Sequence, residues 1–67
     1  MIEITVNGKS EQLDESASVM DLISTMALQG KRIAVEVNGD IVPASQHAKH
    51  KLAAGDKVEI VGAIGGG

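Results

Sequence analysis

SVMDLISTMALQG, residues 18–30, is the one segment of this chain with the apolar spacing of an amphipathic helix. Apolar side chains recur in it at intervals of three and four residues, which places them on one helical face: Val19, Leu22, Ile23 and Met26. Ser18 is expected to cap the first turn, with Asp21 three residues on completing a capping box. Gly30 suits the left-handed position after the helix, with Leu28 as a late apolar contact.

The residues before and after this helix alternate between apolar and polar, which predicts strands. A hairpin is expected from residues 2–6 and 9–13, because Asn7-Gly8 between them favours a tight turn with two positive φ angles. The same Asn-Gly pair follows residues 33–37, and the short return strand Ile41-Val42 ends at Pro43. The predicted helix is therefore flanked by two hairpins.

The last third of the chain is less regular. Residues 44–51 have no convincing period and are expected to form an irregular connection with one helical turn, after which Leu52 enters the core. Turn residues at 54–56 precede a final strand from Lys57 to Val61, and Ile64 stays in phase if that strand continues. A single sheet with one helix on its apolar face, an α+β fold, accounts for this order of elements.

The composition limits both the architecture and the partners. The chain of 67 residues is expected to form one domain, with no Phe, Trp, Tyr or Cys and a net charge of −3. The acidic balance argues against nucleic acid, and the lack of cysteine excludes disulfides, thiolate metal sites and cysteine nucleophiles. No apolar run approaches a transmembrane helix and no signal-peptide pattern is present, so we expect no membrane association and a cytoplasmic location.

No set of side chains resembles an active site. His47 and His50 lie three apart, but a metal site needs more ligands than this pair, so solvated loop histidines and no bound metal are expected. Glu11, Asp14 and Glu15 precede the helix cap, where carboxylates normally face water. The serines form no Gly-x-Ser-x-Gly motif. The sequence therefore predicts no catalytic residue and no enzyme.

The chain ends in three glycines, Gly65, Gly66 and Gly67. Such an end can be a frayed terminus without function. It can also be a probe, since glycine has no Cβ and enters narrow channels. Residues 63–67 are predicted to form a flexible tail, which would reach about 17 Å when extended. From the tail alone, the frayed terminus is the simpler interpretation.

Three segments together resemble a known family. VEVNGDIVP (residues 35–43), GDKVEIV (residues 55–61) and the glycine tail are similar to the ThiS family, the ubiquitin-like sulfur carriers of thiamine biosynthesis. The resemblance covers essentially the full length. It implies a ubiquitin-like β-grasp fold, with one mixed sheet packed on a single main helix and a flexible tail. The third glycine exceeds the two that suffice in the family, so Gly65 is interpreted as a spacer.

The resemblance also implies a mechanism. An activating enzyme would use ATP to adenylate the carboxylate of Gly67, and a persulfide would convert it into a thiocarboxylate. Gly66 and Gly65 would enter the channel of the partner, and thiazole synthase would accept the sulfur. ATP and any zinc would belong to the activating enzyme, so this chain is expected to bind no cofactor. A protein without cysteine can carry sulfur in this way.

The body of the domain must then be recognised by successive partners. Ala34 and Val61 are out of phase with the core pattern and Ala63 precedes the glycines, so Val61 and Ala63 are candidate docking residues. Three alternatives remain: a sulfur carrier for molybdopterin or another pathway, a non-conjugated β-grasp interaction module, and a small enzyme using His47 or an acidic residue. Removal of Gly67 would leave the interaction module functional.

Overall fold

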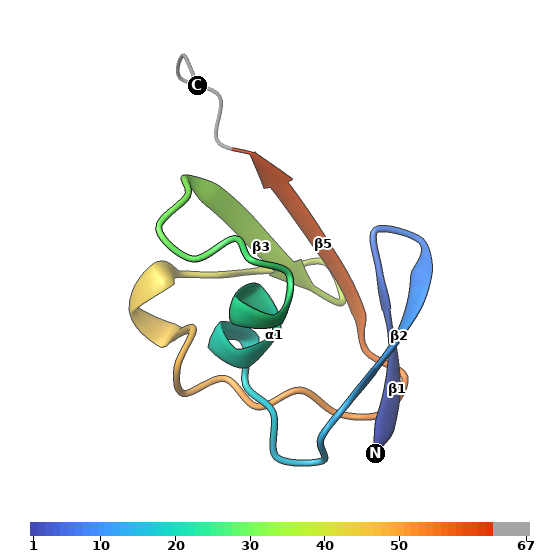
Figure 1. The fold of residues 1–67 in the computed structure, drawn as a ribbon. Coiled ribbons are helices and arrows are strands. Elements are labelled where there is room, and N and C mark those ends of the chain that lie inside the picture. The colour runs from blue at the N-terminus through green and yellow to red at the C-terminus, as the bar shows by residue number, and fades with distance from the viewer. Residues whose placement is uncertain (63–67) are drawn as a thin grey trace.

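The computed structural model describes residues 1–62 and contains the predicted hairpins, helix and final strand (Figure 1). Its elements, in chain order, are β1 (Ile2–Val6), β2 (Lys9–Leu13), α1 (Val19–Thr25), β3 (Ile33–Val37), β4 (Asp40–Val42), the 3-10 helix η1 (Ala44–Gln46) and β5 (Lys57–Gly62). The irregular connection with one helical turn is confirmed by η1. The predicted flexible tail, residues 63–67, lies outside the described residues.

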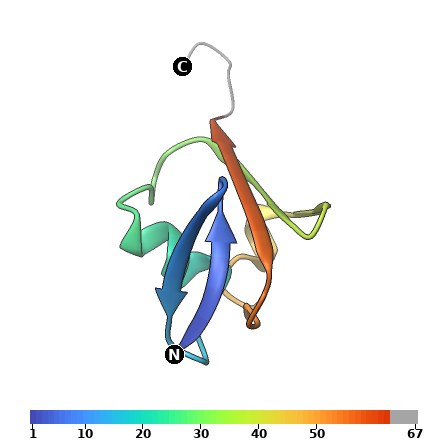
Figure 2. The same cartoon turned by 90° about the vertical axis from the view of Figure 1, so that its right-hand side faces the viewer.

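The five strands form one mixed sheet in the order β2-β1-β5-β3-β4. β5 is central and runs parallel to β1, whereas the β1–β2, β3–β4 and β3–β5 pairs are antiparallel. Figure 2 shows the β1–β2 hairpin with β5 on its right and α1 on its left. The last strand therefore enters between two hairpins that are far apart in the sequence.

Both hairpins turn at their Asn-Gly pairs, as predicted. Asn7 and Gly8 have φ angles of 51° and 85°, and Asn38 and Gly39 have φ angles of 53° and 89°. Positive φ at both central residues defines the type I′ turn, whose twist matches that of the flanking strands. These turns fix which residues oppose one another across each hairpin.

The core lies between α1 and one face of the sheet (Figure 1). Thirteen aliphatic side chains are buried in it: Ile4, Val6, Leu13, Ala17, Val19, Leu22, Ile23, Val35, Val37, Val42, Leu52, Val58 and Ile60. Val19, Val35 and Val58 have no exposed surface. Alternate residues of each strand fill this face, which is why a period of two predicted it. Leu52 enters the core as expected.

The start of α1 is fully hydrogen-bonded. The Ser18 hydroxyl accepts a bond from the Asp21 amide at 3.2 Å, and the Asp21 carboxylate accepts one from the Ser18 amide at 2.9 Å, which confirms the capping box. The amides of Val19 and Met20 donate to the carbonyls of His50 and His47. The segment after η1 thus closes the helix terminus, and no free amide remains there to bind an anion.

The end of α1 differs from the prediction. The helix stops at Thr25, and the left-handed residue directly after its cap is Ala27, with a φ of 59°. Gly30, three residues further on, is also left-handed as predicted, with a φ of 81°. The amide of Ala27 donates to Ser24 and that of Leu28 to Ile23, the two bonds of a Schellman motif. The burial of Leu28 against the core fixes this early stop, because glycine preference is weaker than apolar packing.

His47 also differs from the prediction of a solvated loop histidine. Its side chain is only 5% exposed, and Nε2 lies 3.0 Å from the carbonyl oxygen of Val42. The backbone carbonyl of His47 accepts the Met20 amide at 2.9 Å. The histidine therefore joins the end of β4 to the start of α1, a contact between distant segments that no local pattern signals.

Candidate functional site

The end of β5 is the structural base for the predicted carrier tail. On one side β3 pairs with it as far as Gly62, which lies opposite Ile33. On the other side β1 ends at Val6, but the Asn7 side chain continues the ladder. Its Oδ1 accepts the Ile60 amide at 2.8 Å and its Nδ2 donates to the Ile60 carbonyl at 3.1 Å. β5 is thus hydrogen-bonded on both flanks to within two residues of its end.

Asn7 was predicted from the sequence only as a turn residue. Its backbone takes that role, while its side chain supports a strand 53 positions away in the sequence. An Asn-Gly turn signal does not reveal where the amide group points. This supporting residue could be found only from the arrangement of β1 and β5.

Val61 lies on the sheet face away from α1, as predicted. Its side chain is 58% exposed, and its register partner on β3 is Ala34. The two residues form an apolar pair on the uncovered face, next to the end of β5. Ala63, Gly65, Gly66 and Gly67, the other predicted site residues, lie outside the described residues.

A second row of the same face was not predicted as part of a site. Glu59 on β5 and Glu36 on β3 are register partners, and Glu36 is also the partner of Ile41 on β4. Ile41 is 60% exposed. The signal was available in the sequence, because the turn at residues 38–39 sets Glu36 opposite Ile41. Its partner on β5 could not be known before the β3–β5 register.

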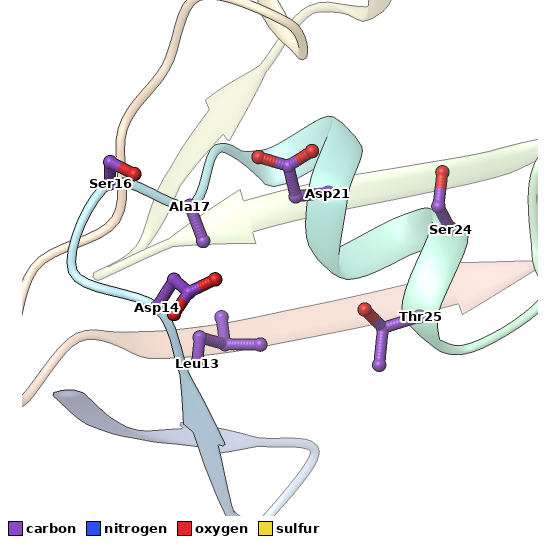
Figure 3. A pocket seen from close by; sticks show the side chains of 7 residues that line it. All are labelled: Leu13, Asp14, Ser16, Ala17, Asp21, Ser24 and Thr25. Atoms are coloured by element: carbon purple, nitrogen blue, oxygen red, sulfur yellow. The ribbon is translucent and has the colours of Figure 1, made fainter. Parts of the chain in front are cut away.

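A hollow lies beside the start of α1 (Figure 3). It has a volume of about 380 Å³ and lies between the end of β2 and the helix. It is lined by Leu13, Asp14, Ser16, Ala17, Asp21, Ser24 and Thr25. The carboxylate of Asp21 already serves the helix cap, and the backbone hydrogen bond from Ser18 lowers the pKa of that group. It is therefore committed to structure.

The remaining candidates do not come together. Glu15 forms an exposed ion pair with the amino terminus at 3.8 Å, while Glu11 lies on the edge strand β2. Within residues 1–62 no three His, Asp or Glu side chains are grouped closely enough to hold a metal ion. No helix in the same range has the length and apolarity to cross a membrane. The end of β5 and the uncovered sheet face are the features that remain as a site.

A mixed sheet with parallel first and last strands, wrapped against one helix and ending at a central strand, defines a ubiquitin-like β-grasp protein. The ThiS family model matches residues 2–67, and the chain belongs to that family. The structure is similar to the crystal structure of the thiamine biosynthesis protein ThiS from Geobacter metallireducens, with a TM-score of 0.83 and 33% identity. That similarity covers 98% of this chain and all of the other.

Two further relatives extend the comparison. A thiazole synthase of Paramagnetospirillum magneticum is 36% identical over 66 residues, or 98% of this chain. The chain spans only 20% of the length of that synthase. An uncharacterized protein, ycf40, of Porphyra purpurea is 32% identical over 98% of this chain and 93% of its own length.

Proposed function

We propose that this protein is a sulfur carrier of thiamine biosynthesis and that the C-terminal carboxylate of Gly67 is its working group. The observation that supports this most strongly is the ThiS family match over residues 2–67, which includes the three glycines. A similar solved structure is a thiamine biosynthesis protein, which favours this pathway over molybdopterin synthesis. The lack of cysteine in the chain agrees with a carrier that holds sulfur on its terminus.

The chemistry starts from a carboxylate, which is a poor electrophile because it has no good leaving group. An activating enzyme transfers AMP from ATP to the Gly67 carboxylate and releases pyrophosphate. The terminal sulfur of an enzyme persulfide then attacks the carbonyl carbon, and AMP leaves with the C–O bond electrons. A thiol cleaves the resulting acyl disulfide, which releases the Gly67 thiocarboxylate and leaves a new disulfide. All side chains for these steps belong to the partners.

The folded body presents the tail to those partners. The hydrogen bonds of β3 and Asn7 hold β5 in a fixed direction, so the residues after Gly62 start from a defined place. We assign Gly65 and Gly66 to the partner channel, because glycine passes where a Cβ would not. Val61 and Ala63 are assigned to docking at the mouth of that channel. A rigid base lowers the entropy cost of placing the tail.

Thiazole synthase is the proposed sulfur acceptor. A thiazole synthase of another organism contains a segment similar to this whole chain, in a polypeptide about five times as long. Physical linkage raises the effective concentration of two modules that act together. The similarity therefore supports a carrier and a synthase that work on each other.

The test is the intact mass of the protein before and after incubation with a ThiS-activating enzyme, ATP and a persulfide donor. The mass should rise by the exchange of one oxygen for sulfur, and fragmentation should place the change at Gly67. A variant lacking Gly67 should not be thiolated, whereas Lys49→Ala, in the connection before β5, should react as the wild type. Unmodified wild-type protein with a competent enzyme would support the interaction module instead.

A further inference from the structure

The covered face of the sheet is incompletely filled at the end where β5 finishes. Gly62 is the last residue of β5 and lies opposite Ile33, the first residue of β3 (Figure 1). A Cβ built on Gly62 would meet no atom of the described residues within 4 Å. Ile33 is only half-buried, although Val35 and Val37, its neighbours on the same face, are buried. The sheet therefore leaves apolar surface open beside its own last residue.

A hollow of about 250 Å³ lies beside Ile33, between α1, the segment that follows α1, and η1. Its apolar lining comes from Met20, Ile23, Leu28, Ile33 and Ala44. Met20 is 38% exposed, and Leu28 and Ile33 are only partly buried against the core. His47 also lines the hollow, but Nε2 of its ring already faces the Val42 carbonyl. The hollow is thus a mainly apolar site that can accept an aliphatic side chain.

The tail brings an aliphatic side chain to this place. Beyond Gly62 the sequence is Ala63-Ile64-Gly65-Gly66-Gly67, so Ile64 is the one large apolar residue of the tail. Positions 58, 60 and 62 of β5 alternate onto the covered face, and the next position of that series is 64. Two residues span at most about 7 Å, which keeps Ile64 close to Ile33 and to the hollow that Ile33 lines.

The same side of the hollow supplies positive charge. Lys31 lines it and is followed by Arg32, and its lining in the described part of the chain contains no carboxylate. The two basic residues immediately precede Ile33, the register partner of Gly62. From Ile64 to the end of Gly67 the chain reaches about 10 Å, so the terminal carboxylate can approach these cations. An apolar side chain followed by a carboxylate therefore matches the site in shape and in charge.

We propose that this hollow is a docking site for the protein's own tail, with Ile64 packed against Leu28 and Ile33 and the Gly67 carboxylate beside Lys31. Burial of one isoleucine is comparable in free energy to the cost of ordering two residues, so docked and released tails are both populated. Only the released tail enters a partner channel, so docking lowers the apparent affinity of partners for it. Docking does not depend on the proposed function, whereas its effect on partners does.

Methyl NMR of the full-length protein tests the contact directly. Nuclear Overhauser effects are expected between the methyl groups of Ile64 and those of Leu28 and Ile33. Met20→Glu should abolish them, because it replaces an apolar lining residue by a carboxylate that repels the tail terminus. Ile41→Glu makes the same change of charge at an exposed residue of the uncovered face and should leave them intact.

Two further perturbations test the charge and the second wall of the hollow. Lys31→Gln/Arg32→Gln should weaken the Ile64 contacts, and so should about 500 mM salt. Ala44→Asp, at an exposed position of η1, should abolish them and replaces Met20→Glu if that variant does not fold. Wild-type protein without contacts from Ile64 to the hollow would overturn the proposal. Contacts found only between copies, in a mixture of labelled and unlabelled protein, would overturn it too.

The effect on partners has its own readout. If about half of the tails are docked, Met20→Glu should be thiolated about twofold faster than the wild type at limiting activating enzyme. Equal rates for the two proteins would overturn this effect while leaving the contact in place. Absence of thiolation in both would count against the proposed function alone, because the NMR contacts require no enzyme.

Discussion

The two faces of the sheet are built from alternate residues of the same strands, but one face is buried under α1 and the other is exposed. On β5, Val58 and Ile60 are buried under α1, whereas Glu59 and Val61 face away from it. On β3, Val35 and Val37 are buried and their neighbour Glu36 lies on the uncovered face. The covered face is uniformly aliphatic, while the uncovered face mixes apolar, acidic and basic side chains.

This difference separates what the fold requires from what it permits. A buried position must be apolar and of the right volume, since a cavity or an unpaired polar group costs free energy. A position on the uncovered face has no such constraint from packing. Packing does not require Glu36 and Glu59, which lie opposite each other on this face. Side chains on the uncovered face are therefore free to serve contacts with partners.

The largest expected effect is a loss of folding stability, and it is measured by comparing one substitution under the covered face with one on the uncovered face. Leu22→Ala, in the helix that covers the sheet, should cost about 2–5 kcal/mol, because the side chain is fully buried. Val61→Ala on the uncovered face should cost less than about 1 kcal/mol. Urea unfolding followed by far-UV circular dichroism measures both, since the chain has no Trp or Tyr.

The domain is expected to have a total stability of only about 3–10 kcal/mol, so Leu22→Ala can unfold a large fraction of the protein. Leu22→Met is the matched control, because it roughly conserves volume and should cost less than about 1.5 kcal/mol. Equal losses in Leu22→Ala and Val61→Ala would contradict the division between the two faces.

A smaller effect is expected at the support of β5. Asn7→Gly keeps the positive φ of the turn but removes both side-chain hydrogen bonds to Ile60. We expect a loss of about 1–3 kcal/mol, because partly buried backbone groups of the strand lose their partners. Asn38→Gly in the other turn is the comparison, since its bonds to Asp56 and Lys57 are exposed and should contribute less. Similar losses at both turns would show that the amide of Asn7 has no special role.

The sequence was sufficient to predict the covered face and the elements that form it. A period of two along residues 2–6, 33–37 and 57–61, and a period near 3.6 from Val19 to Met26, correspond directly to burial under α1. The Asn-Gly turns and the capping box are local, so each could be recognised from adjacent residues. The exposed Val61 followed from the same alternation.

What the sequence could not supply depends on contacts between distant segments. His47 is buried because β4 and α1 meet around it, and the opposition of Glu36 and Glu59 requires the β3–β5 register. The early end of α1 at Thr25 reflects the packing of Leu28, which overrides the preference for glycine at the helix end. The predicted assignments of Ala63 and of Gly65, Gly66 and Gly67 stay predictions.

A still smaller effect, of opposite sign, is expected at the end of the covering helix. Ala27 holds a left-handed φ of 59°, which places its Cβ close to the following backbone. Ala27→Gly should stabilise the protein by about 0.5–1 kcal/mol, because relief of that strain exceeds the added freedom of the unfolded chain. Ala54→Gly, at an exposed residue without a positive φ, should be neutral or destabilising. The midpoint of urea unfolding should move in opposite directions for the two variants or move only for Ala27→Gly.

The smallest expected effect concerns the start of that helix and its response to acid. The backbone and hydroxyl hydrogen bonds of Ser18 lower the pKa of the Asp21 carboxyl in the folded protein. The unfolded chain therefore binds a proton more readily than the folded one, so this carboxylate stabilises the fold above its ordinary pKa. That contribution is lost as the pH falls from about 4 through the pKa of Asp21 in the folded protein.

Asp21→Asn should be less stable than the wild type at pH 7, and the curves of unfolding free energy against pH for the two proteins should converge in acid. Ser18→Ala should keep part of the pH dependence, since the backbone bond, the larger cause, remains. A difference between Asp21→Asn and wild type that is constant from neutral to acid pH would show that the capping bond does not discriminate between the two protonation states.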